Sequence, residues 1–193
     1  MLLLYTVEQS AKKAAPDRDR LDRCIQGIAE NDRAAFEEFY NLTRASVYGY
    51  TLSVLKNTHD AQDAMHDCYL SVYKGAAGYK SSGKPMAWVI TIAKNHCLKR
   101  LNSQKAESIG TETAENIFAD SPELGDEDRM VISKCLTALS DEERQIVVLH
   151  AVAGFKHREI AEQLSLPVST VLSKYSRALN KLKAEFLKEN HAL

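Results

Sequence analysis

The amino-acid sequence predicts an all-α protein with two small helical domains, spanning 21–105 and 129–193, joined by a flexible acidic linker. Apolar side chains recur at helical rather than alternating spacing in both halves of the chain. The linker, 106–128, contains eight acidic residues and no lysine or arginine, a composition typical of an extended connection. The two observations together separate a front domain from a back domain.

Composition sets broad limits on function. With 193 residues, 45% of them hydrophobic, the chain is long enough for one or two packed cores. A net charge of −1 gives no sign of a nucleic-acid ligand, so such an argument depends on where the charges lie. The cysteines occur singly, which favours neither a disulfide framework nor a zinc site: Cys24, Cys68, Cys97 and Cys135. No cofactor is predicted. The apolar run 1–4 is too short for a signal peptide or membrane span, so the sequence predicts a cytoplasmic protein.

The front domain is predicted to follow a flexible lead-in, 1–20, to which the sequence assigns no function. A short helix is then expected over 21–30, with one apolar side formed by Leu21, Ile25 and Ile28. A longer helix, 32–56, keeps aromatic and aliphatic residues at helical spacing. These two helices supply the first half of the predicted front core.

The third helix is predicted over 61–74, after a turn and cap at 57–60. Its buried stripe comprises Ala61, Ala64, Met65, Cys68, Tyr69 and Val72. Three aspartates, Asp60, Asp63 and Asp67, form an acidic row at spacing i, i+3, i+7. Simple solvation explains such a row as well as binding does, because acidic residues are stabilising near a helix N-terminus.

A loop rich in glycine and serine, 75–85, leads into a fourth helix, predicted over 85–104, with proline at its first turn. The polar face of this helix is basic and includes Lys94, Lys99 and Arg100. An aromatic-bearing loop followed by a basic helix suits single-stranded nucleic acid, because base stacking and phosphate neutralisation act together. Considered by itself, Trp88 has the pattern of a core residue.

The back domain is predicted to begin with a helix over 129–139. Ser140 and Glu143 have the spacing of a capping box, which begins a helix directed toward Gly154. The next helix, 157–164, has an apolar face of Ile160, Ala161 and Leu164. It is expected to end at Ser165-Leu166-Pro167, because proline lacks the N–H that a helix needs.

The last helix starts at Val168 and completes a helix-turn-helix, a motif whose second helix enters the major groove of DNA. Its inward face is formed by Val171, Tyr175, Ala178 and Leu182. Its outward face is basic, with only Glu185 opposing Lys174, Arg177, Lys181, Lys183 and Lys188. The pattern favours DNA binding, although an ordinary helical hairpin with a solvated basic face has the same pattern.

The order of these blocks resembles the bacterial extracytoplasmic-function (ECF) sigma factors. The resemblance rests on DAQDAMHDCYLSVY, KPMAWVITIAKNHCLKRL, the acidic linker and ALSDEERQIVVLHAVAGFKHREIAEQLSLPVSTVLSKYSRALNKL. It covers nearly everything from Arg33 to Leu187. It implies a dissociable subunit that binds core RNA polymerase, directs it to specific promoters and opens the DNA. The front domain would be region 2 and the back domain region 4.

The resemblance also implies roles for individual residues of region 2. Docking on the clamp helices of the largest polymerase subunit would use Asp60, Asp63, His66 and Asp67, with histidine standing where glutamine is usual. Capture of the non-template strand at the minus-ten element would use Trp88, Lys94, Asn95, Lys99 and Arg100. Asn95 would lie near a flipped base, while the three cations would hold phosphates.

Region 4 would read the minus-thirty-five element and contact the flap of the second-largest polymerase subunit. The expected DNA-binding residues are Thr170, Leu172, Ser173, Lys174, Ser176 and Arg177. Arg177 is the strongest of these, because arginine can contact guanine with two hydrogen bonds. The chain departs from the family at Leu172, where Lys or Arg is usual, and at Lys156, where a capping Ser is usual. Control by an anti-sigma factor is a further expectation, and the acidic linker would thread through the polymerase.

Two other classes of function compete with this interpretation. A stand-alone helix-turn-helix regulator would bind a palindrome as a dimer, but it gives no reason for the basic aromatic block of the front half. A metal hydrolase could draw on His59, His66, His96, His150 and His157. These histidines occupy unrelated helix positions, and no HExxH, phosphate loop or nucleophile elbow is present, so the sequence predicts that the protein is not an enzyme.

Overall fold

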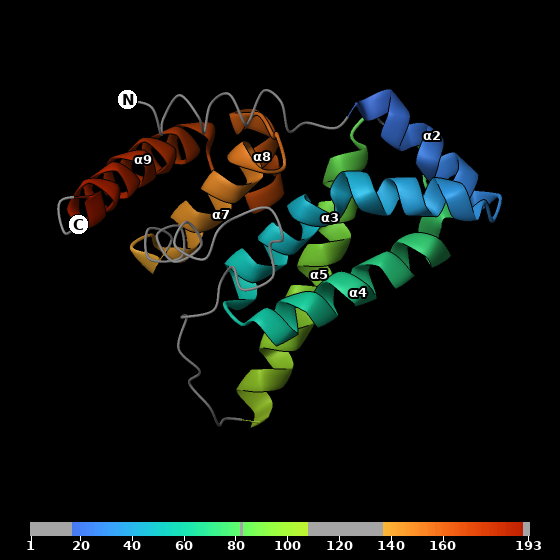
Figure 1. Ribbon diagram of the computed structural model, residues 1–193, viewed down its shortest axis with the longest axis horizontal. Helices are drawn as coiled ribbons and strands as arrows, with labels where there is room; N and C mark the ends of the chain where they lie inside the picture. Colours follow the sequence, from blue (N-terminus) through green and yellow to red (C-terminus); the bar gives the residue numbers. More distant parts are fainter. Residues whose placement is uncertain (1–16, 82, 108–136, 191–193) are drawn as a thin grey trace.

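The computed structural model describes residues 17–81, 83–107 and 137–190. All regular structure in these ranges is helical, which confirms the all-α prediction. Figure 1 shows two groups of helices, α2 to α5 and α7 to α9, which meet where α3 approaches α7. Three predicted segments lie wholly or partly outside the described residues: the lead-in up to residue 16, the linker from residue 108, and residues 129–136 of the helix predicted over 129–139, which include Cys135.

The front group contains four α-helices and one short 3-10 turn. They are α2 (Arg18–Ala29), α3 (Arg33–Leu55), α4 (Thr58–Gly75), η1 (Ala76–Gly78) and α5 (Pro85–Glu107). Asp17, Asp32 and Asn57 cap the first three α-helices by accepting backbone N–H groups. The cap at Asp17 starts α2 three residues earlier than predicted, so 18–20 belong to a helix rather than to the lead-in.

The back group consists of α7 (Asp141–Ala151), α8 (His157–Leu164) and α9 (Val168–Asn190). The predicted capping box is confirmed, since Ser140 N–H donates to Glu143 Oε2 at 2.9 Å and Glu143 N–H donates back to Ser140 Oγ. Ser165 ends α8 in the left-handed conformation, with φ 56°. The chain therefore has the helix-turn-helix that the sequence predicts.

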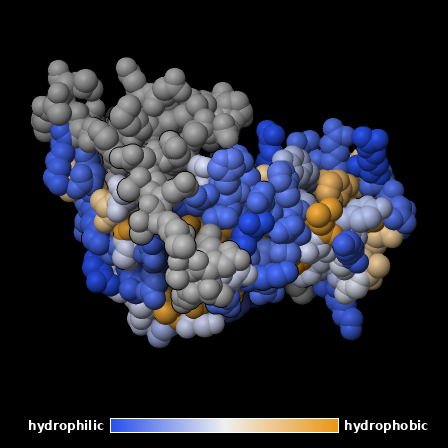
Figure 2. Space-filling view, turned by 90° about the horizontal axis from the view of Figure 1, so that it is seen from below, coloured by the Kyte–Doolittle hydropathy of each residue, from blue (hydrophilic) through white to orange (hydrophobic). Residues whose placement is uncertain are grey.

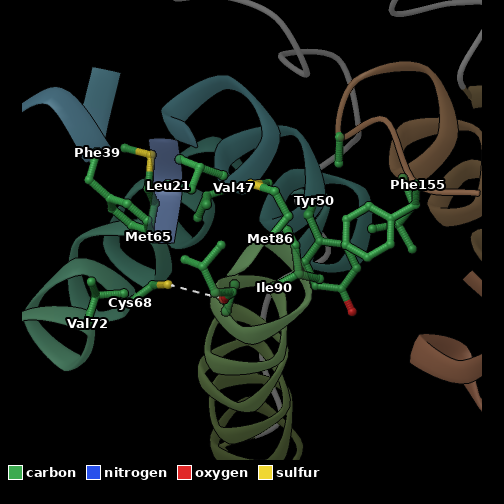
Figure 3. Close-up of a cluster of buried hydrophobic side chains, with 14 of the residues drawn as sticks. Leu21, Phe39, Val47, Tyr50, Met65, Cys68, Val72, Met86, Ile90 and Phe155 are labelled. Carbon is green, nitrogen blue, oxygen red and sulfur yellow. Dashed lines mark hydrogen bonds between the residues drawn. The ribbon is translucent and has the colours of Figure 1, made fainter. Parts of the chain in front are cut away.

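The two groups share one hydrophobic core. Figure 3 shows Phe155 reaching from the α7–α8 loop toward Tyr50 of α3 and toward Met86 and Ile90 of α5. Phe155 is 4% exposed, and Ala153 in the same loop is 3% exposed. The orientation of the two groups, which the sequence leaves open, is therefore set by apolar side chains of the α7–α8 loop.

Polar contacts reinforce the same packing. Ser46 Oγ of α3 donates to the backbone oxygen of Val152 at 3.1 Å. Nearby, Gly49 of α3 faces Val148 of α7, and a Cβ at Gly49 would lie 3.4 Å from Val148 Cγ1. At the C-terminal end of α3, Lys56 forms an ion pair with Asp141 at 2.6 Å.

Two properties expected from composition can be compared with the described residues. Cys24, Cys68 and Cys97 are buried free thiols, as expected of small core residues. None of the described helices combines the length and the apolar character needed to cross a membrane.

Candidate nucleic-acid interface

An aromatic pair lines an open groove where the loop after α4 meets the start of α5. The rings of Tyr79 and Trp88 lie 4.8 Å apart and are tilted by 51°. Tyr79 Oη donates to Asp22 Oδ1 at 2.6 Å, which anchors the loop to α2. The groove is lined by Gly78, Tyr79, Lys80, Lys84, Ala87, Trp88 and Thr91. A half-buried indole beside a tyrosine and two lysines can stack on an unpaired base and attract its phosphates.

The polar residues of α5 continue from this groove along one side of the helix. Trp88, Thr91, Asn95 and Lys99 follow each other at steps of three or four residues, which places them in one line. Thr91, Asn95 and Lys99 are exposed. Lys94 is half-buried, and its Nζ donates to the backbone oxygen of Gln163 at 2.9 Å. The line has the form of a track for a single strand that begins at an aromatic platform.

Arg100 lies in a different environment from this track. Its guanidinium approaches Asp60 at 3.5 Å, Asp63 at 3.4 Å and Asp67 at 3.3 Å. The cation therefore crosses from α5 to the acidic row on α4, and its side chain is only 27% exposed. Arg100, one of the three cations expected to hold phosphates, is therefore paired with carboxylates. Its positive charge partly neutralises the acidic row. His66, on the same helix as the row, is exposed.

Exposed apolar side chains lie farther along α4. Leu70 is 59% exposed and Tyr73 is 49% exposed, while Tyr73 Oη donates to Asn31 Oδ1 at 3.0 Å. Figure 2 shows hydrophobic patches interrupting a largely hydrophilic face of the molecule. Exposed leucine and tyrosine next to an acidic row combine apolar contact with charge, as protein-binding surfaces do.

The outward face of α9 carries the residues expected to read DNA. Leu172, Ser173, Ser176 and Arg177 are exposed, whereas Thr170 and Lys174 are half-buried. Arg177 Nε donates to the backbone oxygen of Ser173 at 3.3 Å, which holds the guanidinium along its own helix. The inward residues Val171, Ala178 and Leu182 are buried as predicted.

The basic face of α9 is less positive than the sequence predicts. Lys174 pairs with Glu142 at 2.7 Å, and Lys181 pairs with Glu143 at 2.7 Å. The expectation that Glu185 alone opposes the cations of α9 was therefore wrong, because α7 brings two carboxylates from the first turn after its cap. Glu185 does pair with Lys188.

Three rings fix α9 against the rest of the helix-turn-helix. His150 and His157 stack with ring centroids 4.5 Å apart, and Tyr175 meets their edges at 4.9 Å and 5.0 Å. His150 Nδ1 lies 2.8 Å from the backbone oxygen of Phe155, to which it can donate. Burial, and then the neighbouring His150, lowers the pKa of His157 below its ordinary value.

The ring cluster predicts acid sensitivity. A histidine with a lowered folded-state pKa contributes its full stability above the unfolded pKa of about 6.5, and that stability is lost as pH falls below this value. We expect His157→Phe, which keeps a ring, to reduce the difference in unfolding free energy between about pH 7.5 and about pH 5.5. Urea denaturation at both pH values measures this difference. His59→Gln, at an exposed position, is the control, and equal pH dependence in both variants would refute the role of His157.

Comparison with known proteins identifies the family. The family described as Sigma-70 region 2 matches residues 39–107, and the family described as Sigma-70, region 4 matches residues 129–182. The ECF RNA polymerase sigma factor SigK of Mycobacterium tuberculosis is 31% identical over 172 residues, covering 84% of this chain and 91% of that protein. SigK of Mycolicibacterium vanbaalenii is 30% identical over 171 residues, covering 84% and 87%. The chain therefore belongs to the ECF sigma factors of RNA polymerase, a family of transcription initiation factors rather than of enzymes.

Solved structures share the fold. The sigma factor RpoE of Bartonella quintana, solved with the anti-sigma factor NepR, aligns with a TM-score of 0.64 at 21% identity and covers 78% of this chain and 96% of that one. CnrH, solved with the cytosolic domain of CnrY, aligns with a TM-score of 0.57 at 20% identity and covers 87% and 96%. Membership of this family disfavours the stand-alone regulator, because both sigma-70 regions are present in one chain.

Proposed function

We propose that α5 captures the non-template strand of the minus-ten element and thereby opens the promoter. The single observation that carries this proposal is the line from Trp88 through Asn95 to Lys99, which starts at the groove beside Tyr79. An aromatic platform takes an unstacked base, an exposed amide can pair with a base edge, and a lysine neutralises phosphate. Lys94 joins this set when its contact with Gln163 is broken.

Strand opening on this surface needs no nucleotide hydrolysis. Unpairing and unstacking a base costs a few kcal/mol, which binding of the flipped base in a pocket offsets. The Tyr79 and Trp88 rings are already in contact, and the hydrogen bond to Asp22 holds the loop in place. Because the platform is arranged in advance, less binding free energy is lost in ordering it.

We assign polymerase docking to α4. Asp60, Asp63, His66 and Asp67 would face the clamp helices of the largest subunit, and exposed Leu70 would add apolar contact. Arg100 acts here as a positioning residue that holds the acidic row rather than as a phosphate ligand. The remaining negative charge of the acidic row would steer and orient docking on the polymerase more than it would raise the binding affinity.

We assign minus-thirty-five recognition to α9, with contact to the flap of the second-largest subunit made by the same back group. Arg177 would give up its hydrogen bond to the Ser173 oxygen and contact a guanine instead. Its exposed neighbours Ser173, Ser176 and Leu172 would complete the reading face. Lys174 would contact phosphate only in exchange for Glu142.

We further propose that an anti-sigma factor controls this protein. We also propose that this protein acts in the cytoplasm and has no enzymatic activity of its own. Support comes from the solved neighbours, in which RpoE is bound to the anti-sigma factor NepR and CnrH to the cytosolic domain of CnrY. The test of control is reporter transcription in cells, where full activity without any inducing signal would contradict it.

The experiment for the proposed function is transcription in vitro with purified protein, bacterial core polymerase and a genomic promoter library. Discrete transcript starts that share two spaced upstream sequences are expected. Asn95→Ala should then weaken dependence on the downstream sequence, and Arg177→Ala dependence on the upstream sequence. Absence of core-dependent starts, with footprints from the protein alone, would contradict the proposal.

Lys99 and Arg100 are adjacent cations for which we expect different phenotypes. Lys99→Ala should weaken holoenzyme binding to a minus-ten single strand and reduce its salt slope by about 0.7 to 1. Arg100→Ala should leave that slope unchanged and lower the free energy of unfolding by about 1 to 2 kcal/mol, because three carboxylates lose their shared cation. Anisotropy titrations at several salt concentrations and urea denaturation separate the two effects. Equal salt slopes in the two variants would contradict the assignment.

A further inference from the structure

One carboxylate of α2 holds the loop that lines the groove. Tyr79 Oη donates to Asp22 Oδ1 at 2.6 Å, and Ser81 Oγ donates to Asp22 Oδ2 at 2.8 Å. Both oxygens of this half-buried aspartate therefore accept from hydroxyls of the same loop. Hydrogen bonds to an ionised acceptor are stronger than those between neutral groups, and a pair of them adds a geometric constraint. Asp22 thus anchors the loop at two points.

The anchored loop contacts the indole on which we expect a base to stack. The Tyr79 and Trp88 rings lie 4.8 Å apart, and a Cβ at Gly75 would lie 3.7 Å from Trp88 Cζ2. The chain therefore approaches the indole at the end of α4 and again at Tyr79. Gly78, Tyr79 and Lys80 supply the loop side of the groove, and Trp88 lies on the helix side. A shift of the loop would therefore change the shape of the groove.

The composition of the loop indicates why an anchor matters. Gly75, Gly78 and Gly83 have no Cβ, so ordering this segment costs more conformational entropy than ordering most segments of its length. Lys80 and Ser81 are exposed, so burial does not hold this part of the loop. A mobile surface can adapt to different ligands, whereas a fixed one favours the ligand that fits its shape. The two hydrogen bonds to Asp22 therefore favour a groove of one shape.

We propose that Asp22 is a positioning residue for base selection, which fixes the groove in which a base of the minus-ten strand is recognised by holding Tyr79 and Ser81. The inference rests on the proposed function of α5. Asp22 lies on α2, outside the line from Trp88 to Lys99, and acts through the loop. Loss of the anchor changes which base is preferred more than it weakens strand binding, because phosphate contacts carry no sequence information.

The test uses holoenzyme and promoters that carry every single-base substitution in a minus-ten element found by the transcription experiment. The measured quantity is the ratio of transcription from the preferred base to transcription from each substituted base. Asp22→Ala removes the anchor. Asp22→Asn keeps both contacts, because an amide oxygen can accept from Tyr79 and an amide N–H can donate to Ser81 Oγ. Asp19→Ala, which removes an exposed carboxylate from the same helix, is the control.

We expect Asp22→Ala to lower this ratio about three- to tenfold at the position captured in the groove, which is the effect of losing a typical hydrogen bond. Ratios for substitutions in the minus-thirty-five element should stay unchanged. Asp22→Asn and Asp19→Ala should keep the minus-ten ratio within about twofold of the wild-type value. A purely structural role for Asp22 would instead lower transcription from all promoters by the same factor and leave every ratio unchanged.

Tyr79→Phe combined with Ser81→Ala removes the two donors, keeps an aromatic ring, and tests the proposal even if Asp22→Ala does not fold. This variant should reproduce the lower ratio. Adding Asp22→Ala to it should cause no further loss, because all three substitutions remove the same contacts. Additive losses, or unchanged ratios in both variants, overturn the positioning role while the function of α5 stands. A wild-type holoenzyme whose transcription does not depend on the minus-ten sequence overturns both.

Discussion

Replacing Phe155 with alanine is expected to lower the free energy of unfolding by about 3 to 5 kcal/mol. The ring is 4% exposed and belongs to the core that joins the two helix groups (Figure 3). Its removal loses the free energy of transferring the ring from water and leaves a cavity between Tyr50, Met86 and Ile90. Urea denaturation followed by circular dichroism measures the change.

Two further variants serve as controls for the effect of Phe155→Ala on stability. Leu187→Ala removes an apolar side chain that is 47% exposed on α9, and we expect it to change stability by less than about 0.5 kcal/mol. Phe155→Leu keeps most of the apolar volume and should fall between the two. A Phe155→Ala protein that unfolds at the same urea concentration as Leu187→Ala would show that the two groups do not share a core.

Helices were predictable because their signals are local. The spacing of apolar residues predicted the buried stripe of α4. The capping box predicted the start of α7, and the proline predicted the end of α8. The early start of α2 depends on Asp17, whose capping role was not separable from other aspartates in the same stretch. The shared core was not predictable, because Phe155 lies in a loop and periodicity says nothing about its partners.

The types of residue in the candidate site were predictable from the sequence. The side chains that they contact were less predictable. The line on α5 was predictable, because the helical spacing of Trp88, Asn95 and Lys99 can be read from the sequence. The partners of Arg100 lie 33 to 40 residues away in sequence, so only the packing of α5 on α4 reveals them. The same applies to Lys174 and Lys181, which meet carboxylates of α7. Tyr79 was missed as a partner of Trp88, although an aromatic residue in a glycine-rich loop was the available signal.

Replacing Trp88 with alanine is expected to reduce promoter-dependent transcription about 10- to 100-fold, since stacking of one base on an aromatic ring contributes about 1 to 3 kcal/mol. The indole is half-buried beside Tyr79 and lines the open groove, so part of it is accessible to a base. Run-off transcription from a duplex promoter measures the loss. Thermal unfolding of the same variant shows how much of the loss comes from lower stability.

The Trp88 prediction separates strand capture from a merely structural role by using two templates. On a promoter whose minus-ten segment is already mismatched and unpaired, the cost of melting is absent, so Trp88→Ala should lose less activity than on duplex DNA. Trp88→Phe keeps a stacking ring and should retain most activity on both templates. A destabilised fold would lower transcription equally on both, because the amount of active protein would be the same. An equal loss on duplex and unpaired templates would therefore assign the indole to the core of the front group rather than to DNA.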